Sequence, residues 1–210
     1  MKKIFLAICM LSLIACNNKQ KQETETITEI KEEENKLRII NKKYAMAANK
    51  LEQIANYDGL TGLPNRRMFL RELSKASKNS KNDFGLIFMD LNGFKKVNDQ
   101  WGHGMGDQVL IEIASRLKSL VKTNDFVARL GGDEFIMLVK FDKKEEIYET
   151  SQKIQVSISK PIHLEELECQ ISVATGISIY SENISNIQDM IQSADLAMYE
   201  HKRHTKIGSN

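Results

Sequence analysis

The sequence has too little proline, glycine and cysteine for several classes of protein. Its 210 residues include 2 prolines, 11 glycines and 3 cysteines. So little proline and glycine excludes a low-complexity linker and a collagen-like repeat. Three cysteines cannot build a disulfide framework. With 41% apolar and 28% charged residues, the composition is that of an ordinary globular protein, which excludes a polytopic membrane protein and a wholly disordered chain.

An excess of charge of one sign is also missing. The chain carries 30 lysine and arginine residues against 28 aspartate and glutamate residues, for a formal net charge of +2 at pH 7. Nucleic-acid-binding proteins usually concentrate a stronger basic excess on one face. We therefore expect no nucleic-acid partner.

The N-terminus has the features of a bacterial export signal in the usual order. Two lysines precede an apolar run over residues 4–15. The run is shorter than the about 20 residues that a membrane-spanning helix needs, and it is typical of the apolar part of a secretory signal. Residues 13–16, Leu-Ile-Ala-Cys, resemble a lipoprotein cleavage box. We expect residues 1–16 to be a leader, with a lipid on Cys16 and association with a membrane; the alternative is a short buried helix with an incidental cysteine.

Two segments connect this leader to the rest of the chain. Residues 17–36 are polar and rich in glutamate, which predicts a solvated tether. Residues 37–56 predict a helix. A set of apolar residues with heptad spacing, typical of a coiled-coil seam, runs along it: Ile30, Leu37, Ile40, Tyr44, Ala47, Leu51 and Ile54. The seam either pairs two copies of the chain or packs on the chain's own globular domain.

Residues 57–210 alternate between helical and strand patterns. Asn65 is suited to cap a helix over 66–78. The patterns predict further helices at 106–121, 145–158 and 187–204, and strands at 84–89, 126–130, 135–139 and within 161–179. Two of these strands flank Gly131 and Gly132 closely enough to form a β-hairpin. The order of elements predicts an α+β fold, with helices packed on one face of a sheet.

Acidic residues stand at the ends of two predicted strands. Gly131 and Gly132 allow a tight turn and an unobstructed approach of a ligand, and Asp133 and Glu134 follow them directly. Neighbouring residues of a strand point to opposite faces, so these two carboxylates do not both face one metal. A lone aspartate at a strand end is more often a turn former. If the strand that ends at Asp90 lies beside the hairpin, however, Asp90 and Asp133 converge and offer Mg²⁺ its preferred oxygen ligands.

Residues 131–135, Gly-Gly-Asp-Glu-Phe, resemble the signature of the GGDEF family of diguanylate cyclases. Four further segments resemble elements of the same family, in the same order: DGLTGLPNR at 58–66, DLNGFKKVND at 90–99, GHGMGD at 102–107 and ADLAMY at 194–199. Together the five segments cover about residues 56–206. The resemblance implies a central, mostly antiparallel sheet flanked by helices, like the palm of nucleotidyl cyclases and polymerases.

The resemblance implies a reaction as well. Two molecules of GTP, one in each domain of a homodimer, would give cyclic di-GMP and two pyrophosphates. By the same resemblance, Asp90 and Asp133 would bind Mg²⁺ or Mn²⁺ together with the backbone carbonyl of Leu91. Asp133 would also be the base that accepts the proton of the attacking 3′-hydroxyl.

The family also implies a set of substrate-binding residues. Asn98 and Asp107 would read the guanine edge, because a carboxylate accepts from guanine N1–H and N2–H₂, donors that adenine does not present there. His103 would lie near the nucleoside. Backbone and lysine groups would meet the phosphates: Gly93, Phe94, Lys95, Lys202 and Lys206. Singly, each of these residues could instead cap a turn or be a surface charge, but the five ordered segments favour the functional interpretation.

Two departures from the family pattern bear on activity. Lys206 stands where arginine is usual, and lysine lacks the planar fork that grips phosphate with two hydrogen bonds. We expect weaker triphosphate binding. Many members also carry an R-x-x-D site for inhibition by the product just before the signature. Residues 122–125 here read Lys-Thr-Asn-Asp, so we expect weak or absent product inhibition.

The leader and the substrate point to different compartments. GTP is a cytosolic substrate, whereas a lipoprotein signal would carry everything after residue 16 across the membrane. The sequence therefore leaves the side of the membrane open. It also leaves two alternatives to a working cyclase, namely a lipid-anchored module that binds GTP without turnover and a dimerising envelope protein whose domain is a relic.

Overall fold

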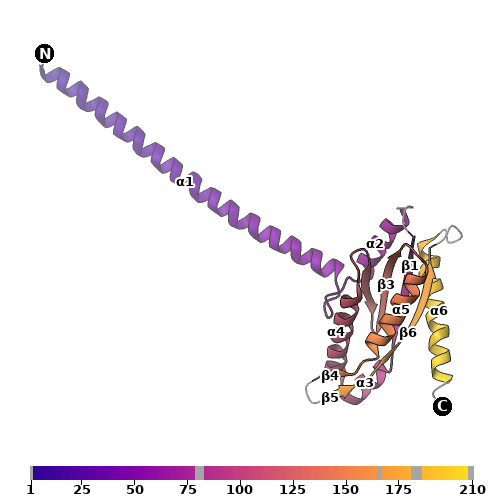
Figure 1. Ribbon diagram of the computed structural model, residues 1–210. Coiled ribbons are helices and arrows are strands. Elements are labelled where there is room, and N and C mark those ends of the chain that lie inside the picture. Colours follow the sequence, from indigo (N-terminus) through magenta and orange to yellow (C-terminus); the bar gives the residue numbers. More distant parts are fainter. Residues whose placement is uncertain (1, 79–82, 165–166, 181–185, 208–210) are drawn as a thin grey trace. The chain divides into compact units, whose positions relative to one another are not determined.

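The computed structural model describes residues 2–78, 83–164, 167–180 and 186–207 (Figure 1). Side chains within these ranges are described except at 2–9, 11–12, 23–30, 167 and 204–207. The chain divides into two compact units, residues 1–52 and 53–210, and each is treated by itself.

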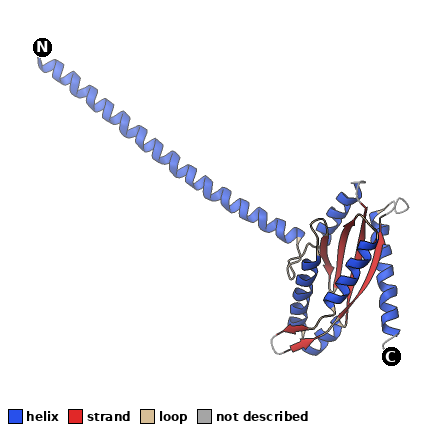
Figure 2. Ribbon diagram, viewed as in Figure 1, coloured by secondary structure: helices blue, strands red, loops and turns tan. Residues whose placement is uncertain are grey.

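The second unit is built on a four-stranded antiparallel sheet with the order β2-β3-β1-β6 (Figure 2). Its strands are β1 (Asp83–Asn92), β2 (Phe126–Gly131), β3 (Glu134–Phe141) and β6 (Ser172–Ile179). The helices are α2 (Arg66–Lys78), α3 (Phe94–Trp101), α4 (His103–Leu120), α5 (Glu145–Ile158) and α6 (Ile187–Ile207). A separate two-stranded hairpin joins β4 (Ile162–Leu164) to β5 (Leu167–Cys169). The predicted α+β fold is confirmed.

Helices cover both faces of the sheet, so the prediction that they pack on one face is wrong. One apolar cluster joins α3, α4 and α5 to one face, and a second joins α2 and α6 to the other. The physical reason is visible in β1, where all six residues from Phe84 to Met89 are buried. A strand buried on both faces has a continuous apolar run in place of alternation, so its sequence indicates two covering layers.

Two local features differ from the predicted elements. Phe94–Trp101 form α3, a helix that was not among the predicted elements, because Phe94 and Val97 are spaced to bury one helical face. Helix α4 begins at His103, before the predicted start at 106. The cap on α2 is as predicted, since the Met68 amide donates to Asn65 Oδ1 at 3.1 Å.

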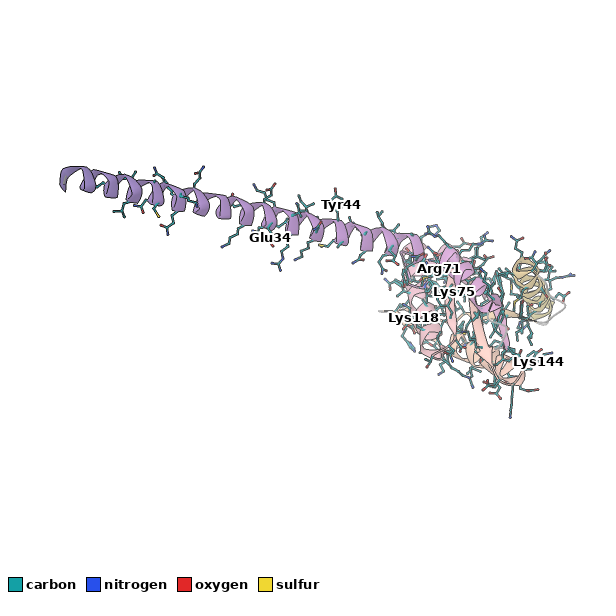
Figure 3. The ribbon with its side chains drawn as sticks, turned by 90° about the horizontal axis from the view of Figure 1, so that it is seen from above. Glu34, Tyr44, Arg71, Lys75, Lys118 and Lys144 are labelled. Atoms are coloured by element: carbon teal, nitrogen blue, oxygen red, sulfur yellow. The ribbon has the colours of Figure 1, made fainter. Side chains whose placement is uncertain are left out.

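The first unit lies within a single helix, α1 (Lys2–Asn56). The helix covers the predicted helical segment and also residues 17–36. The described apolar residues of the seam, such as Leu37, Tyr44 and Leu51, have exposed side chains, and Figure 3 shows Tyr44 projecting from α1. Among the described residues, no helix is at once long and apolar enough to span a membrane.

Candidate functional site

The glycines of the signature make a tight turn between β2 and β3. Gly132 has φ 51° and Gly131 has φ 153°, conformations that residues with a side chain seldom adopt. A Cβ placed on either glycine would meet no atom within 4 Å. The turn is the predicted hairpin, and its outer surface is open to a ligand.

The same turn brings Asp133 next to Asp90. Strand β1 pairs with β3 so that Asp90 lies opposite Glu134, and the Leu91 amide donates to the Asp133 carbonyl at 3.3 Å. Burial and the charge of Asp90 raise the pKa of the Asp133 carboxyl above its ordinary value. Two carboxylates from neighbouring strands therefore share one end of the sheet.

Helix α6 adds a cation to this pair. Lys202 Nζ lies 2.5 Å from Asp90 Oδ1, and the two side chains are only 25% and 14% exposed. In Figure 1 the end of β1 that leads into α3 lies at the same end of the sheet as the C-terminal part of α6. Lys206 belongs to the same helix, but its side chain lies outside the described part.

The donor set suits a divalent cation that a nucleotide helps to bind. Mg²⁺ usually takes one or two protein carboxylates together with substrate phosphates and water, and Asp90 and Asp133 supply the two carboxylates. Among the described residues, no group of three or more histidine, cysteine, aspartate or glutamate side chains could hold a metal. The Leu91 side chain has no ligating atom and is buried in the core. Only the backbone carbonyl of this residue could serve as a ligand.

Glu134 lies directly opposite Asp90 in the pairing of β1 with β3, so these two side chains point to the same face of the sheet. It lines a pocket of about 200 Å³ between α2, β3 and α6, with Arg66 and Asp195. Burial, followed by the charges of Asp90 and Asp195, raises the pKa of Glu134 above its ordinary value. The two acids of the signature therefore border different spaces.

The predicted guanine-binding residues gather at the corner between α3 and α4. The Gly102 amide donates to the Asn98 carbonyl at 2.8 Å. The Asn98 side chain lies over Gly106, where an added Cβ would come too close to Asn98 Oδ1. His103 and Asp107 are exposed in the first turns of α4. Asn98 on α3 thus contacts the residue before Asp107 on α4, across the short connection at Gly102.

The predicted phosphate-binding segment forms the start of α3. Gly93 precedes the helix with φ 86°, and no side chain caps it. The first amides of a helix have no partners within the helix, so those at the start of α3 are available to an anion. Phe94 is buried, whereas Lys95 is exposed. The segment follows directly on Asp90 and Asn92 at the end of β1.

Sequence reasoning missed the link that holds the signature turn in place. Arg129 donates from Nη1 to Asp58 Oδ1 at 2.9 Å, and from Nε and Nη2 to the Gly132 carbonyl at 3.0 and 2.7 Å. Burial alone would raise the pKa of Asp58, but hydrogen bonds from Thr61 and Arg129 outweigh it, and the pKa is lowered. Asp58 stands within one matching segment and Arg129 two residues before another, yet they are 71 positions apart, and no local signal pairs them.

Asp125, which directly precedes β2, accepts hydrogen bonds from two backbone amides. Its Oδ2 accepts from the Lys122 amide at 3.2 Å, and its Oδ1 accepts from the Lys140 amide at 3.1 Å. The Lys122 ammonium pairs with Glu146 at 3.4 Å. Both charged side chains of this segment therefore already have partners within the protein.

Comparison with known proteins identifies the second unit. The family model described as "Diguanylate cyclase, GGDEF domain" matches residues 55–207. The bifunctional diguanylate cyclase/cyclic di-GMP phosphodiesterase MucR of Pseudomonas aeruginosa is 38% identical over 167 residues, which are 78% of this chain and 24% of MucR. The diguanylate cyclase TpbB of the same species is 35% identical over 157 residues, 72% of this chain and 36% of TpbB.

A solved structure extends the likeness to the fold. The crystal structure of the coiled coil and GGDEF domain of DgcB from Caulobacter crescentus, in complex with c-di-GMP, matches with a TM-score of 0.71 and 29% identity. The match covers 81% of this chain and 94% of that one. By contrast, the chain spans about a quarter to a third of the length of MucR and TpbB.

Proposed function

The chain belongs to the GGDEF family of diguanylate cyclases, and on that premise we propose that it is itself a cyclase that condenses two GTP into cyclic di-GMP. The observation that carries the proposal is the closeness of Asp133 to Asp90 at one end of the sheet, where the Leu91 amide donates to the Asp133 carbonyl and the charge of Asp90 acts on the Asp133 carboxyl, beside the open signature turn. The two carboxylates, the open turn and the free amides of α3 form the set of groups that a metal-bound triphosphate requires.

The acidic pair would hold the metal and accept a proton. Asp90 and Asp133, with the Leu91 carbonyl, would bind Mg²⁺ or Mn²⁺. When bound, the metal would neutralise charge on the phosphates and fix the positions of the reacting oxygens. Asp133 would accept the proton of the 3′-hydroxyl that attacks the α-phosphate of the other GTP, releasing pyrophosphate.

The remaining residues would bind and orient GTP. Asn98 and Asp107 would read the guanine, with His103 beside the nucleoside. The amides around Gly93 and Phe94, together with Lys95, would meet the phosphates. Lys202 and Lys206 would approach the phosphates from α6. Lysine at 206 offers a point charge where the family usually has a planar fork, so we expect weaker binding of GTP than in arginine-bearing relatives.

Synthesis needs two domains, because each GTP attacks the other. We propose that two copies pair in parallel along the exposed apolar seam of α1. Parallel pairing would bring the C-terminal ends of the two helices, and with them the two catalytic domains, to the same end of the coiled coil. The seam is short and includes Tyr44 and Ala47, so the pairing is expected to be weak and concentration-dependent.

Turnover by the purified full-length chain tests the proposal. With GTP and Mg²⁺, we expect cyclic di-GMP and two pyrophosphates per product, and no product without a divalent metal. A folded chain that forms no cyclic di-GMP at any protein concentration would refute a cyclase. The alternative is a module that binds GTP without turnover, which Lys206 favours. Tight GTP binding without release of pyrophosphate would support it.

Replacing Gly106 by alanine tests the guanine-binding corner. The added Cβ would overlap Asn98 Oδ1, so the Asn98 side chain must move away from its position over Gly106. We expect KM for GTP to rise about tenfold, as for the loss of one good hydrogen bond to a bound ligand, with little change in thermal stability. Gly104→Ala is the matched control, because its Cβ would meet no atom within 4 Å. Equal KM values in the two variants would contradict the role of Asn98.

We expect cyclic di-GMP to leave the initial rate essentially unchanged. Lys122 lacks the stacking surface and paired donors of an arginine, and Asp125 is committed to two backbone amides. The measurement is the initial rate of pyrophosphate release as the product is added. Lys122→Arg restores the residue that the family pattern has there and serves as the comparison. Strong inhibition of the natural chain would contradict the prediction.

Membrane association is a separate proposal, carried by the sequence of the leader. We propose that the N-terminal segment holds the chain at a membrane and that Cys16, whose side chain is exposed, carries a lipid. Metabolic labelling with a fatty acid, compared between the natural chain and Cys16→Ser, tests the lipid. Protease accessibility in intact cells identifies the side of the membrane, and use of GTP requires the cytosolic side.

A further inference from the structure

We propose that Lys202 is an exchangeable internal cation, which occupies the metal-binding carboxylate of Asp90 until the phosphates of a nucleotide draw it away. The inference rests on the proposed function, in which Asp90 binds the metal and Lys202 meets the phosphates. The new element is competition for Asp90 Oδ1, because this oxygen cannot bind the metal and the Lys202 ammonium group at the same time. The protein would therefore bind metal weakly alone and tightly together with nucleotide.

The ion pair itself is the first observation. Lys202 Nζ and Asp90 Oδ1 are 2.5 Å apart, although the residues are 112 positions apart in the chain. Both side chains are largely buried, so the contact is shielded from water and is worth more than an exposed pair. A metal ion that binds through Asp90 Oδ1 must displace this ammonium group.

The local charge explains why a cation is needed there without a metal. Asp90 lies opposite Glu134 in the pairing of β1 with β3, and the amide of the next residue, Leu91, donates to the carbonyl of Asp133. Three acidic groups thus lie within electrostatic reach of one another, with Lys202 as the cation bonded to Asp90. Removing the lysine would leave a more negative site, to which a divalent cation binds more readily.

The fold holds the helix firmly and leaves the lysine side chain able to move. Helix α6 approaches β6 at Gly176 so closely that a Cβ there would overlap the backbone at Ala194 and Met198. One residue before the lysine, His201 Nδ1 lies 3.1 Å from both the amide nitrogen and the carbonyl oxygen of Thr175. A lysine has a flexible stem of four carbons, so its ammonium group can exchange partners while the helix stays in place.

Linkage between the two ligands follows from this exchange. Metal binding to Asp90 alone costs the ion pair, because the ammonium group loses its partner within the protein. A triphosphate supplies new acceptors for Lys202, so the cost disappears when both ligands bind. Each ligand then raises the affinity for the other by the same factor, typically fivefold or more for a coupling of this kind.

The affinity of the full-length protein for Mn²⁺ alone tests the proposal. Free Mn²⁺ is measured by electron paramagnetic resonance, without nucleotide, in the natural chain and in Lys202→Met. We expect Lys202→Met to bind Mn²⁺ about fivefold or more tightly than the natural chain. Lys153→Met is the matched control, because this lysine is exposed on α5 and pairs with Glu149 at the surface, and the Mn²⁺ affinity of this variant should equal that of the natural chain. Adding Asp90→Asn to Lys202→Met should remove the gain.

A second titration measures the coupling. A non-hydrolysable GTP analogue is added, with a correction for Mn²⁺ bound by the analogue itself. It should raise the Mn²⁺ affinity of the natural chain by a larger factor than that of Lys202→Met. Lys202→Arg keeps the charge and should not gain affinity for Mn²⁺ alone. A lysine that only stabilised the fold would give the opposite result, because its removal would loosen the site and weaken metal binding.

Equal or weaker Mn²⁺ binding by Lys202→Met, including no measurable binding, would overturn the proposal. The same holds for a coupling factor that is unchanged by the substitution. These outcomes are distinct from failure of the proposed function, because Mn²⁺ affinity is measured without turnover. A chain that makes no cyclic di-GMP could still show the exchange, and an active cyclase could lack it.

Discussion

Asp133→Asn is expected to lower cyclic di-GMP synthesis by about 10³-fold or more, the range for loss of a general base, while the protein stays folded. The substitution removes a metal ligand and the proposed proton acceptor at once, and asparagine keeps nearly the same shape. The measurement is product formation from GTP and Mg²⁺ by the purified chain. Asp83→Asn is the matched control, because Asp83 is exposed at the start of β1, opposite Phe141 at the far end of β3 from Asp133, and it should leave synthesis unchanged.

The same substitution is expected to raise the stability of the metal-free protein at neutral pH. Burial and the neighbouring Asp90 raise the pKa of Asp133 in the folded state above the ordinary value of an aspartate. The ionised carboxylate therefore destabilises the fold once the pH exceeds the unfolded value, and the full penalty is present above the folded value. The gain from asparagine should appear as a higher Tm at pH 7 and vanish below about pH 3, where aspartate is protonated in both the folded and the unfolded state.

Either of two results would contradict this view of Asp133. Synthesis that persists in Asp133→Asn at a rate near that of Asp83→Asn would mean that another group binds the metal and takes the proton. A lower Tm for Asp133→Asn at pH 7 would mean that the carboxylate stabilises the metal-free fold, in conflict with its burial beside Asp90.

The sequence predicted well those features that depend on neighbouring residues. The hairpin at Gly131 and Gly132 is as predicted, because a short connection leaves few ways to join two apolar runs. The cap of α2 by Asn65 has the same local origin. The approach of Asp90 to Asp133 could be anticipated as soon as two acidic strand ends were assigned to neighbouring strands.

Features that depend on distant residues could not be predicted. Arg129 joins Asp58 to the signature turn across 71 positions, and a sequence gives no sign of which of many arginines and acids will meet. The prediction that helices cover only one face of the sheet was wrong for a related reason. Continuous apolar runs such as Phe84–Met89 show burial, but they do not show which helices supply the cover.

The position of Lys202 illustrates a limit of inference by resemblance. Family likeness assigns this lysine to a phosphate of the substrate, whereas in the structure it pairs with Asp90. Comparison of motifs describes what Lys202 would contact when the substrate is bound. A largely buried ammonium group without a ligand needs another partner, and only the three-dimensional arrangement identifies that partner.

Gly176→Ala is expected to destabilise the protein by about 3 kcal/mol, the upper range for overpacking, and to impair synthesis. A Cβ at this position would lie 2.0 Å from the Ala194 carbonyl oxygen and 2.1 Å from the Met198 amide nitrogen. These are backbone atoms, which cannot turn aside as the end of a side chain can. Helix α6 must therefore move away from β6 as a unit.

Lys202 follows Met198 by one helical turn, so the same displacement should carry its ammonium group away from Asp90 and from any bound triphosphate. Urea unfolding measures the stability, and the rate of synthesis is compared below the unfolding transition. Gly59→Ala is the matched control, because a Cβ there would meet no atom within 4 Å. Equal stability of the two variants would show that α6 tolerates a side chain at this contact. Loss of stability with unchanged synthesis would instead show that the position of α6 does not govern the site. The expected loss of both would identify the glycine contact as the feature that sets where Lys202 stands.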